Sequence, residues 1–410
     1  MSLYNTLSAR GMVSQVTHEE PLQSLLRDQT GAKIYTGFDP TADSLHIGHL
    51  IPVMGLARAQ RAGHHPIALI GGGTALIGDP TGKTEMRKFL TVEDIDKNVE
   101  CIRKQLSKFI DFSDNKATLV NNLDWLGEKN YLDMLRDIGR HFSVNRMLTA
   151  ECFKQRMEHG LSFLEFNYMI LQAYDFMHLE KHMDCKVQMG GDDQWSNMIA
   201  GVDLTRRVSS KEVYGLTYPL LTTSDGKKMG KTEKGAVWLD PEKTSPYEYY
   251  QYWRNIPDDR VSNCLYLFTF LDENKVEELA KVEGAQLNES KAVLAYEATK
   301  ILHGEEAADQ AKHASKAAFG GGNNKEDLPK TQLSAEDVGE DGIPLFALLT
   351  KTGLAKSGNE GRNLVKGGGI YVNEERMADA NQKFTKSDFA KPLELRKGKK
   401  HHHLIELIEG

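Results

Sequence analysis

The sequence predicts an α/β protein in which a doubly wound parallel sheet is followed by an all-helical domain and a small α+β domain. The chain has 410 residues, a length that suggests two to three domains. From about residue 30 to 225, short apolar runs alternate with longer amphipathic ones, which is typical of a parallel sheet built from βαβ units. From about 245 to 318 helix formers dominate, and the compact tail after residue 342 mixes helix and strand patterns.

The first domain, residues 1–225, starts its sheet early. We expect a strand over "AKIYTGFD" (32–39), a helix over "HIGHLIPVMGLARAQRAG" (46–63) and a strand over "HPIALIGGG" (65–73) that runs into a glycine turn. Ligands of such sheets bind beyond the carboxyl ends of the strands. We therefore expect the functional site where these strands end.

The rest of the chain is predicted to change character twice. Residues 226–318 contain helical segments, such as "DENKVEELAKVEG" (272–284) and the stretch 289–318. Residues 319–342 are rich in Gly, Asn, Pro and charge and poor in apolar residues, so we interpret them as a linker. The third domain, 343–410, begins with "IPLFALLTKTGLAKSGNEGRNLVKGG" as helix and continues with "GIYVN" as strand.

The charge is uneven along the chain. The net charge of −7 argues against a protein that coats nucleic acid over its whole surface. Residues 341–410 nevertheless hold 12 Lys and Arg against 9 Asp and Glu, a balance of +3. This basic segment could bind a phosphate backbone locally, or it could be an ordinary solvated surface.

The sequence shows no signal peptide, no membrane span and no paired cysteines, and these features bear on the compartment and the redox state of the protein. The first residues show no apolar run for a signal peptide, and nowhere are there about 18 consecutive apolar residues for a membrane span. The four cysteines are far apart, with no CxxC pair for a disulfide framework or a zinc site. We therefore expect a soluble, cytoplasmic protein without a membrane segment, and buried thiols at Cys101, Cys152, Cys185 and Cys264.

The stretch "GDPTGKT" (78–84) looks like a phosphate-binding P-loop but has the wrong spacing. A P-loop needs a Gly five residues before its Gly-Lys, and Ile77 stands at that position before Gly82. Pro80 also removes one of the amide donors that such a loop presents to a phosphate. A P-loop is therefore disfavoured, and the role of Lys83 needs another explanation.

The strongest local signal is "DPTADSLHIGHL" (39–50), which joins the first strand to the following helix. His46 and His49 are three residues apart, so they share one face of the first helical turn. Beside the unpaired amides of a helix N-terminus, two imidazoles suit an anion. Alternatively, Asp43 or Ser44 caps the helix and the histidines are polar surface residues.

A second signal, "SDGKKMGKTEKG" (224–235), is a cationic loop. Its glycines prevent a stable helix, and its lysines stand at 227, 228, 231 and 234. A lone loop of this kind is most simply a solvated surface turn. Its occurrence together with HIGH at a strand end favours a phosphate-binding role.

These two motifs resemble HIGH and KMSKS of the class I aminoacyl-tRNA synthetases. Lys228-Met-Gly-Lys-Thr232 departs from KMSKS at Gly230 and Thr232, and these departures are typical of tyrosyl-tRNA synthetases. The resemblance to the bacterial tyrosyl enzymes extends over essentially the whole chain, through "YTGFDPTADSLHIGH", "GDPTGKTEMR", "NYMILQAYDF", "GGDDQWSN" and "TSPYEYYQYW". It implies a Rossmann-like catalytic domain, a helical anticodon-binding domain, an S4-like RNA-binding domain and a homodimer.

One helix carries a polar stripe that fits this resemblance. In "LSFLEFNYMILQAYDFMHLEKH", Tyr168, Gln172 and Asp175 lie at i, i+4 and i+7 among apolar residues, so they need polar partners if they are buried. They could also form an ordinary solvent face. The resemblance implies a tyrosine site in which two residues bind the phenolic hydroxyl, three bind the ammonium group and one lies near the carbonyl: Tyr35 and Asp175; Tyr168, Gln172 and Asp79; and Gln194.

The implied reaction is attack of the tyrosine carboxylate on the α-phosphorus of ATP, followed by transfer of tyrosine to tRNA(Tyr). The carboxylate is already a nucleophile, so positioning and charge stabilisation are what the protein must provide. The catalytic residues that the resemblance implies are Thr41, His46, His49, Lys83, Arg87, Lys228 and Lys231. The implied ATP-binding residues are Gly37, Asp39, His46, His49, Gly191, Asp193 and Lys231. Mg²⁺ is expected with ATP, held mainly by the phosphates, and no cage of protein ligands for a metal is evident.

The tail resembles an S4-type RNA-binding module. Its motif, "SGNEGRNLVKGGGIYVNEE", places Ser357, Arg362 and Lys366 on a helix before a glycine turn and a strand. The three histidines 401–403 cannot all face one metal ion from a strand, so we interpret them as a polar edge or as part of the basic RNA face.

Three alternatives can be weighed against this interpretation. A tryptophanyl-type relative would share HIGH but would have no use for Tyr35 and Asp175 aimed at a hydroxyl. A non-catalytic, synthetase-derived RNA-binding protein would not need an intact HIGH, KMGKT and Asp193-Gln194. A P-loop NTPase is opposed by the spacing of its glycines.

Overall fold

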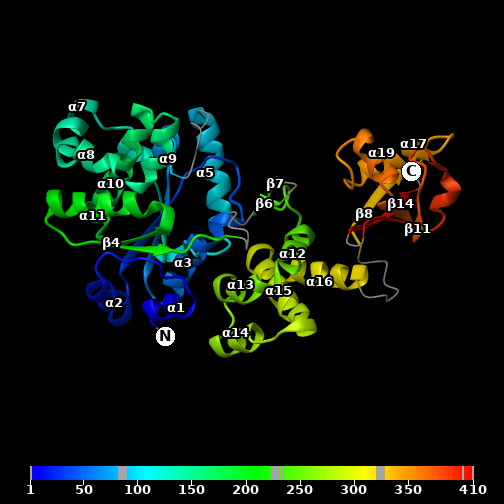
Figure 1. Cartoon of the computed structure of the whole chain (residues 1–410), viewed down its shortest axis with the longest axis horizontal. Coiled ribbons are helices and arrows are strands. Elements are labelled where there is room, and N and C mark those ends of the chain that lie inside the picture. The colour runs from blue at the N-terminus through cyan, green and yellow to red at the C-terminus, as the bar shows by residue number, and fades with distance from the viewer. Residues whose placement is uncertain are drawn as a thin grey trace. The chain divides into compact units, whose positions relative to one another are not determined.

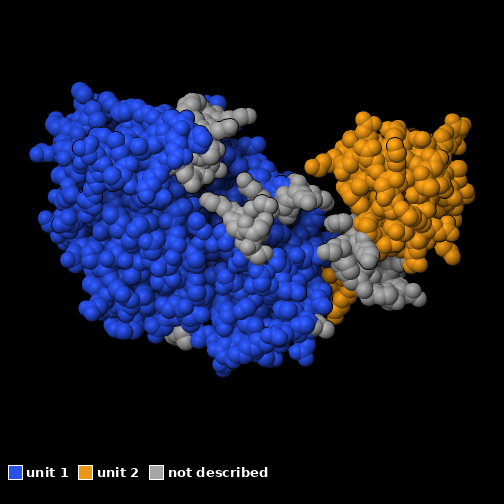
Figure 2. Space-filling model, in the orientation of Figure 1, with its two compact units in different colours: residues 1–304 blue, residues 305–410 orange. Residues whose placement is uncertain are grey.

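The computed structural model describes residues 2–81, 90–222, 231–232, 235–319, 328–398 and 401–408, and at residues 155, 231, 232, 285, 317–319 and 401 it describes the backbone alone. The chain divides into two compact units, residues 1–304 and residues 305–410, which Figure 2 shows in different colours. Lys83, Arg87 and Lys228 lie outside the described residues.

Unit 1 is built on a five-stranded parallel sheet with the strand order β3-β2-β1-β4-β5. The strands are β1 Lys33–Phe38, β2 His65–Ile70, β3 Thr118–Asn121, β4 Cys185–Gly191 and β5 Tyr214–Tyr218. In β2 every residue after His65 is buried, because helices cover both faces of the sheet. The predicted doubly wound sheet is thus confirmed.

Helices cover the two faces of this sheet. Figure 1 shows α10 and α11 on one side of the sheet and α1 and α3 on the other. The helices of this α/β part are α1 Leu3–Ala9, α2 Glu19–Asp28, α3 Leu50–Arg61, α4 Gly72–Ala75, α5 Val92–Leu106, α6 Leu123–Leu126, α7 Tyr131–Asp133, α8 Val144–Leu148, α9 Glu151–His159, α10 Phe163–Met183 and α11 Trp195–Ser209. Shorter turns are η1 Ile47–His49, η2 Ser113–Asn115, η3 Met134–Ile138, η4 Gly139–His141 and η5 Asp192–Gln194.

Helix α10 has clear start and stop signals. Ser162 accepts a hydrogen bond from the N–H of Glu165, whose carboxylate accepts one from the N–H of Ser162, so the two form a capping box. Asp184 adopts a left-handed conformation (φ 55°) and ends the helix. Between these limits Ala173, Tyr174 and Phe176 pack on the sheet in one core cluster with Tyr35.

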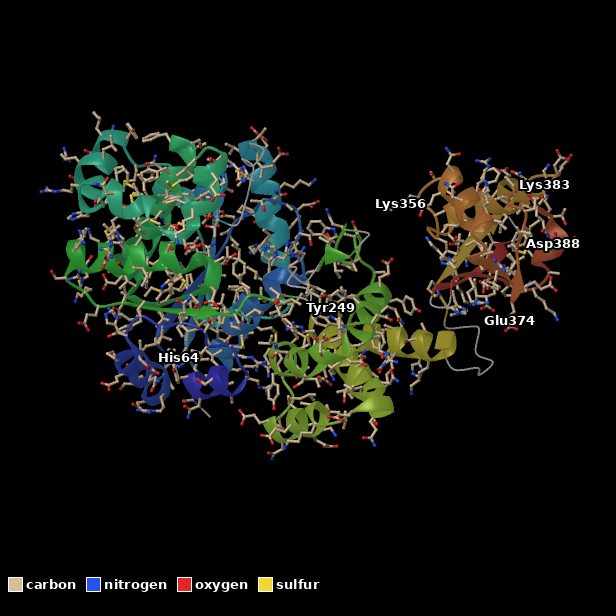
Figure 3. All side chains as sticks on the ribbon, in the orientation of Figure 1. His64, Tyr249, Lys356, Glu374, Lys383 and Asp388 are labelled. Atoms are coloured by element: carbon tan, nitrogen blue, oxygen red, sulfur yellow. The ribbon has the colours of Figure 1, made fainter. Side chains whose placement is uncertain are left out.

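A helical part completes unit 1. It contains α12 Pro246–Arg254, η6 Asp258–Arg260, α13 Val261–Phe268, α14 Glu273–Ala280, η7 Gly284–Gln286 and α15 Leu287–His303, with two short strands ahead of it, β6 Lys231–Thr232 and β7 Gly235–Ala236. Its core includes the fully buried Trp253 and Tyr249, and Tyr249 is labelled among these helices in Figure 3. The predicted helical stretch 289–318 is two helices, because Gly304 has φ 89° and ends α15.

Two buried arginines join the helical part to the α/β part. Arg58 of α3 donates to the carbonyl oxygens of Tyr266 and Thr269, at 3.1 and 2.7 Å. Arg10 donates to the same two oxygens and to that of Leu271. Cations from another part of the unit therefore satisfy the carbonyls at the C-terminal end of α13. The helix dipole favours positive charge at that end.

Unit 2 contains α16 Glu305–Phe319 and a mixed sheet with the order β11-β10-β13-β14-β8. The strands of unit 2 are β8 Lys330–Ser334, β9 Ile343–Pro344, β10 Ile370–Val372, β11 Glu375–Arg376, β12 Lys383–Phe384, β13 Leu393–Lys397 and β14 His401–Ile408. Its other helices are α17 Ala335–Val338, α18 Leu345–Lys351, α19 Gly358–Lys366 and the turn η9 Lys386–Phe389. Leu345, Leu348 and Val365 pack with Leu395 and Ile405 in one core.

One prediction for this unit needs correction. The predicted linker 319–342 contains β8 and α17, because β8 finds a parallel partner in β14, whose residues come some 70 positions later in the chain. In the described residues, the three histidines pair with β13 alone, because the pairing of β14 with β8 begins at Leu404, so their interpretation as a polar edge or as part of the basic RNA face stays a prediction. The side chains of His402 and His403 are hydrogen-bonded to Glu394 and Thr331, each at 2.8 Å. The domain limits stay predictions.

Three of the four thiols that were expected to be buried are buried. All four cysteines are free; Cys152, Cys185 and Cys264 are buried and Cys101 is partly buried. Burial raises the pKa of each of the three buried thiols to about 12, so they remain protonated. Within the described part of the chain, no helix is long and apolar enough to cross a membrane.

Candidate active site

The site forms where the strand order reverses. β2 and β3 extend the sheet on one side of β1, and β4 and β5 extend it on the other, so the loops after β1 and β4 diverge. Asp39 follows β1, and the turn Asp192–Gln194 follows β4. The predicted site residues Gly37, Asp39, Gly191, Asp193 and Gln194 thus lie at this edge of the sheet.

Tyr35 and Asp175 form the buried end of the site. The Tyr35 hydroxyl is buried and has no hydrogen-bond partner among the described residues. Asp175 is 2 % exposed, and burial raises the pKa of its carboxyl group from 3.8 to about 7. Burial, and after it the neighbouring Asp175 carboxylate, also raises the pKa of Tyr35. One unpaired donor beside one carboxylate is the arrangement that a hydroxyl group of a ligand would satisfy.

Two residues that sequence reasoning missed hold the Asp175 carboxylate. The side-chain amide of Asn122 donates to one oxygen at 2.9 Å, and the indole N–H of Trp125 donates to the other at 2.8 Å. Trp125 is in turn stacked on His178, with 4.4 Å between ring centroids. The signal in the sequence was the pair of asparagines in "VNNLDW", where Asn121 ends the short strand β3 and Asn122 follows it, since polar residues at a strand end often belong to the site.

The network continues toward the predicted ammonium site. Asn122 also donates to the Thr74 hydroxyl at 3.0 Å, and Thr74 donates to Asp39 at 2.8 Å. The other Asp39 oxygen accepts a hydrogen bond from the Tyr168 hydroxyl at 2.8 Å. Asp39, which the resemblance assigned to ATP, is therefore connected to the tyrosine-site residues.

Asp79 and Gln194 meet at the same place from different strand ends. The Gln194 amide donates to one Asp79 oxygen at 2.9 Å, while the N–H of Thr81 donates to the other, also at 2.9 Å. Gln172 is partly buried, four residues after Tyr168 on α10. The polar stripe of α10 thus faces the protein interior, and the alternative of a solvent face is excluded for Tyr168 and Asp175.

The HIGH motif is a capped helical turn. The His46 ring accepts a hydrogen bond from the N–H of Gly48 at 3.0 Å, and the His49 ring accepts one from the N–H of His46 at 3.1 Å. Both rings accept through Nδ1, so the neutral rings carry their proton on Nε2 and can donate there. Their centroids are 4.1 Å apart. The two histidines share the first turn as predicted, although this turn is a 3₁₀ helix and α3 begins at Leu50.

The alternative cap residues have other partners. Asp43 pairs with Lys243, and the Ser44 hydroxyl donates to the carbonyl of Leu45 at 2.7 Å. His46 is the N-cap itself. The interpretation of the histidines as surface residues behind a capping Asp or Ser is therefore wrong.

The structure brings HIGH and the segment after KMGKT together. The N–H of Ile47 donates to the carbonyl of Val237 at 3.0 Å, and that of Leu239 donates to the carbonyl of Leu45 at 2.8 Å. Lys231, described by its backbone, pairs with Ala236 in the β6–β7 hairpin just before this contact. Thr41 is exposed on the loop after β1.

The P-loop alternative does not fit the described part of its stretch. Gly78 has φ 85° and follows the short helix α4, whereas a P-loop runs from a strand into a helix. The amide of Thr81 is bound by Asp79, so it is not presented to a phosphate. Lys83 lies beyond these residues, outside the described part.

The predicted RNA-binding residues lie on α19 in unit 2. Ser357 is the N-cap and accepts a hydrogen bond from the N–H of Glu360. The Arg362 guanidinium lies 3.7 Å from the centroid of the Phe346 ring, and Lys366 is exposed in the last turn. Arg362 and Lys366, four residues apart, lie on adjacent turns of one helix side.

Comparisons with known proteins cover nearly the whole chain. Residues 27–320 match the family model of class I tRNA synthetases (W and Y), and residues 323–405 match that of the tyrosine–tRNA ligase SYY-like C-terminal domain. The tyrosine–tRNA ligase of Clostridium botulinum (strain 657 / Type Ba4) is 54% identical over 406 residues, which is 99% of each chain. That of Acetivibrio thermocellus is 53% identical over 408 residues, 99% of this chain and 100% of the relative.

A solved structure agrees with these relatives. A C-terminally truncated mitochondrial tyrosyl-tRNA synthetase of Aspergillus nidulans superposes with a TM-score of 0.70 at 31% identity, over 78% of this chain and 94% of that one. The parallel sheet and the helices that cover it fit this group. The chain therefore belongs to the tyrosine–tRNA ligases of the class I aminoacyl-tRNA synthetases.

Proposed function

We propose that the site at the ends of β1, β2 and β4 activates L-tyrosine with ATP to tyrosyl-adenylate and then transfers tyrosine to the 3′ end of tRNA(Tyr). The observation that carries this proposal is the Tyr35 hydroxyl, buried without a partner in the described part of the chain, beside Asp175. A phenolic hydroxyl can donate to Asp175 and accept from Tyr35. With the phenolic hydroxyl placed there, the ammonium and carbonyl groups of tyrosine and the phosphates of ATP are assigned to the remaining residues of the site.

The buried end favours tyrosine over its competitors for a physical reason. Phenylalanine would leave the Tyr35 hydroxyl unpaired and would bring no donor to the Asp175 carboxylate beyond Asn122 and Trp125. An unpaired buried polar group costs about 1–3 kcal/mol. The indole of tryptophan has a donor but no acceptor, so it leaves Tyr35 unpaired. This argues against the tryptophanyl-type alternative, as do the full-length relatives named tyrosine–tRNA ligase.

The ammonium and carbonyl groups of tyrosine are assigned to the next group of residues. Tyr168, Gln172 and Asp79 surround the ammonium group, and Gln194 lies near the carbonyl. The hydrogen bonds Gln194–Asp79 and Tyr168–Asp39 support this assignment, because they bring polar groups from three strand ends and α10 together. Asp39 acts here through Tyr168.

ATP binds on the side of HIGH and KMGKT. Gly37 and Gly191 allow close approach of the nucleoside, with Asp193 beside it. The Nε2–H groups of His46 and His49 donate to the phosphates. Charge that grows on the phosphates during the attack is stabilised by Thr41, Lys83, Arg87, Lys228 and Lys231. Mg²⁺ accompanies ATP and is held mainly by phosphate oxygens.

No protein nucleophile is needed in this scheme. The tyrosine carboxylate attacks the α-phosphorus, the new C–O–P linkage forms, and the bond to the bridging oxygen of pyrophosphate breaks. In the second step a ribose hydroxyl of tRNA attacks the tyrosyl carbonyl and AMP leaves. Both steps depend on held geometry more than on an acid–base pair.

RNA is bound by two further parts of the chain. The helical part contacts the anticodon region, and the S4-like unit binds the RNA backbone through Ser357, Arg362 and Lys366. Arg362, stacked on Phe346, offers both charge and a planar surface to RNA. Ser357 also caps α19, so it holds the helix that carries the two cations.

The active protein is a homodimer, and the surface that residues 131–163 of unit 1 expose supports this. Six of the ten large hydrophobic side chains that are exposed in the described residues fall between residues 131 and 163. They are Tyr131, Leu132, Leu135, Val144, Met157 and Phe163. Leu132 and Phe163 are 70 % and 69 % exposed, and a second copy of this chain would bury them. The cytoplasm is the proposed location, supported by four free thiols.

The dimer is tested by the mass of the particle in solution. Leu132→Glu is expected to shift the species from dimer to monomer in light scattering. Val92→Glu is the control, because Val92 is 47 % exposed and begins a different helix, α5. A wild type that is monomeric, or a Leu132→Glu protein as dimeric as the control, would count against this face.

The function is tested by ATP–pyrophosphate exchange with each of the twenty amino acids, on the wild type and on Asp175→Ala. We expect exchange with tyrosine alone, and its loss or relaxed specificity in the variant. Exchange driven by tryptophan would restore the tryptophanyl-type alternative, and absence of exchange would restore the non-catalytic one. ATP hydrolysis without an amino acid would point to an NTPase.

A further inference from the structure

The segment after the KMGKT hairpin forms a strand-like pair with HIGH. His46 and Trp238 face each other in an isolated antiparallel bridge, fixed by the two backbone hydrogen bonds from Ile47 and Leu239. Directly opposed residues of an antiparallel pair project their side chains to the same face. The indole of Trp238 is thereby placed beside the first imidazole of HIGH.

The rings themselves are in contact. The Trp238 and His46 centroids are 6.0 Å apart with an interplanar angle of 65°, an edge-to-face arrangement. The His49 ring is the second aromatic neighbour of His46, with 4.1 Å between the two ring centroids. His46 is therefore held by His49, by Trp238 and by its own hydrogen bond to the N–H of Gly48. Its ring has little freedom to rotate.

Trp238 is in turn fixed from the opposite side. Its backbone N–H donates to the hydroxyl of the buried Thr244 at 3.0 Å. Lys243 places its ammonium 5.3 Å from the centroid of the Trp238 ring and pairs with Asp43, three residues before His46. Lys243 therefore links the segment of Trp238 to the segment of HIGH through side chains, and the backbone bridge links the same two segments.

We infer that Trp238 is a positioning residue for the activation step, which holds the His46 ring so that its Nε2–H meets the phosphates. The inference rests on the role that the proposed function gives to His46. The β6–β7 hairpin, which contains the Lys231 backbone, ends at Ala236, so the same bridge also fixes the base of that hairpin against HIGH. Trp238 acts through His46 and does not itself contact substrate.

A positioning role makes a specific kinetic prediction. Trp238→Leu removes the ring contact but keeps the backbone bridge, so it should lower kcat for tyrosine-dependent exchange about tenfold while the KM for tyrosine changes less than about twofold. Trp238→Phe retains an aromatic edge and should recover kcat to within about threefold of the wild type. If Trp238 only supported folding, Trp238→Leu would lower the melting temperature but would not lower kcat selectively, and Trp238→Phe would not recover it.

The decisive experiment is a double-mutant cycle with His46→Ala. If Trp238 acts through the His46 ring, Trp238→Leu should cost less than about twofold in kcat when that ring is already absent. An equal, tenfold cost in both backgrounds overturns the inference. His46→Ala alone tests the proposed function separately, because wild-type kcat in that variant would overturn the role of His46 whatever Trp238 does.

Lys243→Met is the second variant, in case Trp238→Leu does not fold. It removes the cation above the indole and the pair with Asp43 but leaves both rings in place. We expect a loss of about threefold in kcat in the wild type and almost none in His46→Ala. Equal losses in the two backgrounds would again overturn the inference, and Lys243→Arg should restore the activity.

Discussion

The two ends of the site solve different recognition problems. At the tyrosine end, Asp175, Asn122 and Trp125 are buried and their hydrogen bonds run between side chains from separate elements. At the phosphate end, His46 and His49 are partly exposed and bond to backbone amides of their own turn. A neutral hydroxyl can be selected only where water is excluded, whereas phosphates carry enough charge to be bound by cations that remain solvated.

The largest effect should come from breaking the buried end. Asp175→Asn replaces a carboxylate that two donors hold with an amide that presents its own N–H groups to one of them. We expect kcat/KM for tyrosine to fall by at least about 100-fold, about 3 kcal/mol, because a buried donor is left unsatisfied. ATP–pyrophosphate exchange measures this loss. A comparable rise in the KM for ATP would show that the two ends are not separate.

The pH dependence should sharpen the contrast, with the next largest effect. Burial raises the pKa of Asp175 to about 7 in the free protein, while a bound tyrosine hydroxyl favours the ionised form. The KM for tyrosine should therefore rise about tenfold between pH 8 and pH 6 as the carboxyl group takes up its proton. The KM for ATP should not follow the same curve. Asp175→Asn should show no such titration.

The same pKa makes a prediction about stability. The folded protein keeps a proton on Asp175 that the unfolded chain releases above its ordinary pKa of 3.8. The contribution of this group to the free energy of unfolding is therefore greatest below about pH 4 and is lost as the pH rises toward 7. The free energy of unfolding in urea should therefore fall with rising pH more steeply for the wild type than for Asp175→Asn between about pH 4 and pH 7. Parallel curves would contradict the raised pKa.

Trp125→Phe should have a smaller effect at the same end. Phenylalanine can still stack on His178 but cannot donate to Asp175, so one charge-assisted hydrogen bond is lost. We expect a five- to tenfold lower kcat/KM for tyrosine, about 1–1.5 kcal/mol, and an unchanged KM for ATP. Trp253→Phe, in the core of the helical part, is the matched control and should affect the melting temperature rather than the KM.

The sequence predicted what local periodicity can encode. The first strand, the HIGH turn and the stripe of Tyr168 and Asp175 on α10 depend on spacings within one segment, and the structure places them as expected. Asn122, Trp125 and the Trp238 bridge were not predicted, because their partners are brought by strand order and by a contact between segments far apart in the chain. β8 was mistaken for linker for the same reason: its polar residues become a strand through pairing with β14.

The smallest effect is expected from an amide at the exposed end. His49 accepts the N–H of His46 through Nδ1, and the side-chain oxygen of asparagine occupies nearly the same position relative to its backbone. His49→Asn should therefore keep the turn closed and lose only the Nε2 donor, which costs about threefold or less in kcat because a solvated donor to a phosphate contributes little. His49→Leu removes the acceptor as well and should cost about tenfold. If the asparagine variant were as slow as the leucine variant, the imidazole would act mainly on the nucleotide, and the exposed end would depend on individual donors as strongly as the buried end does.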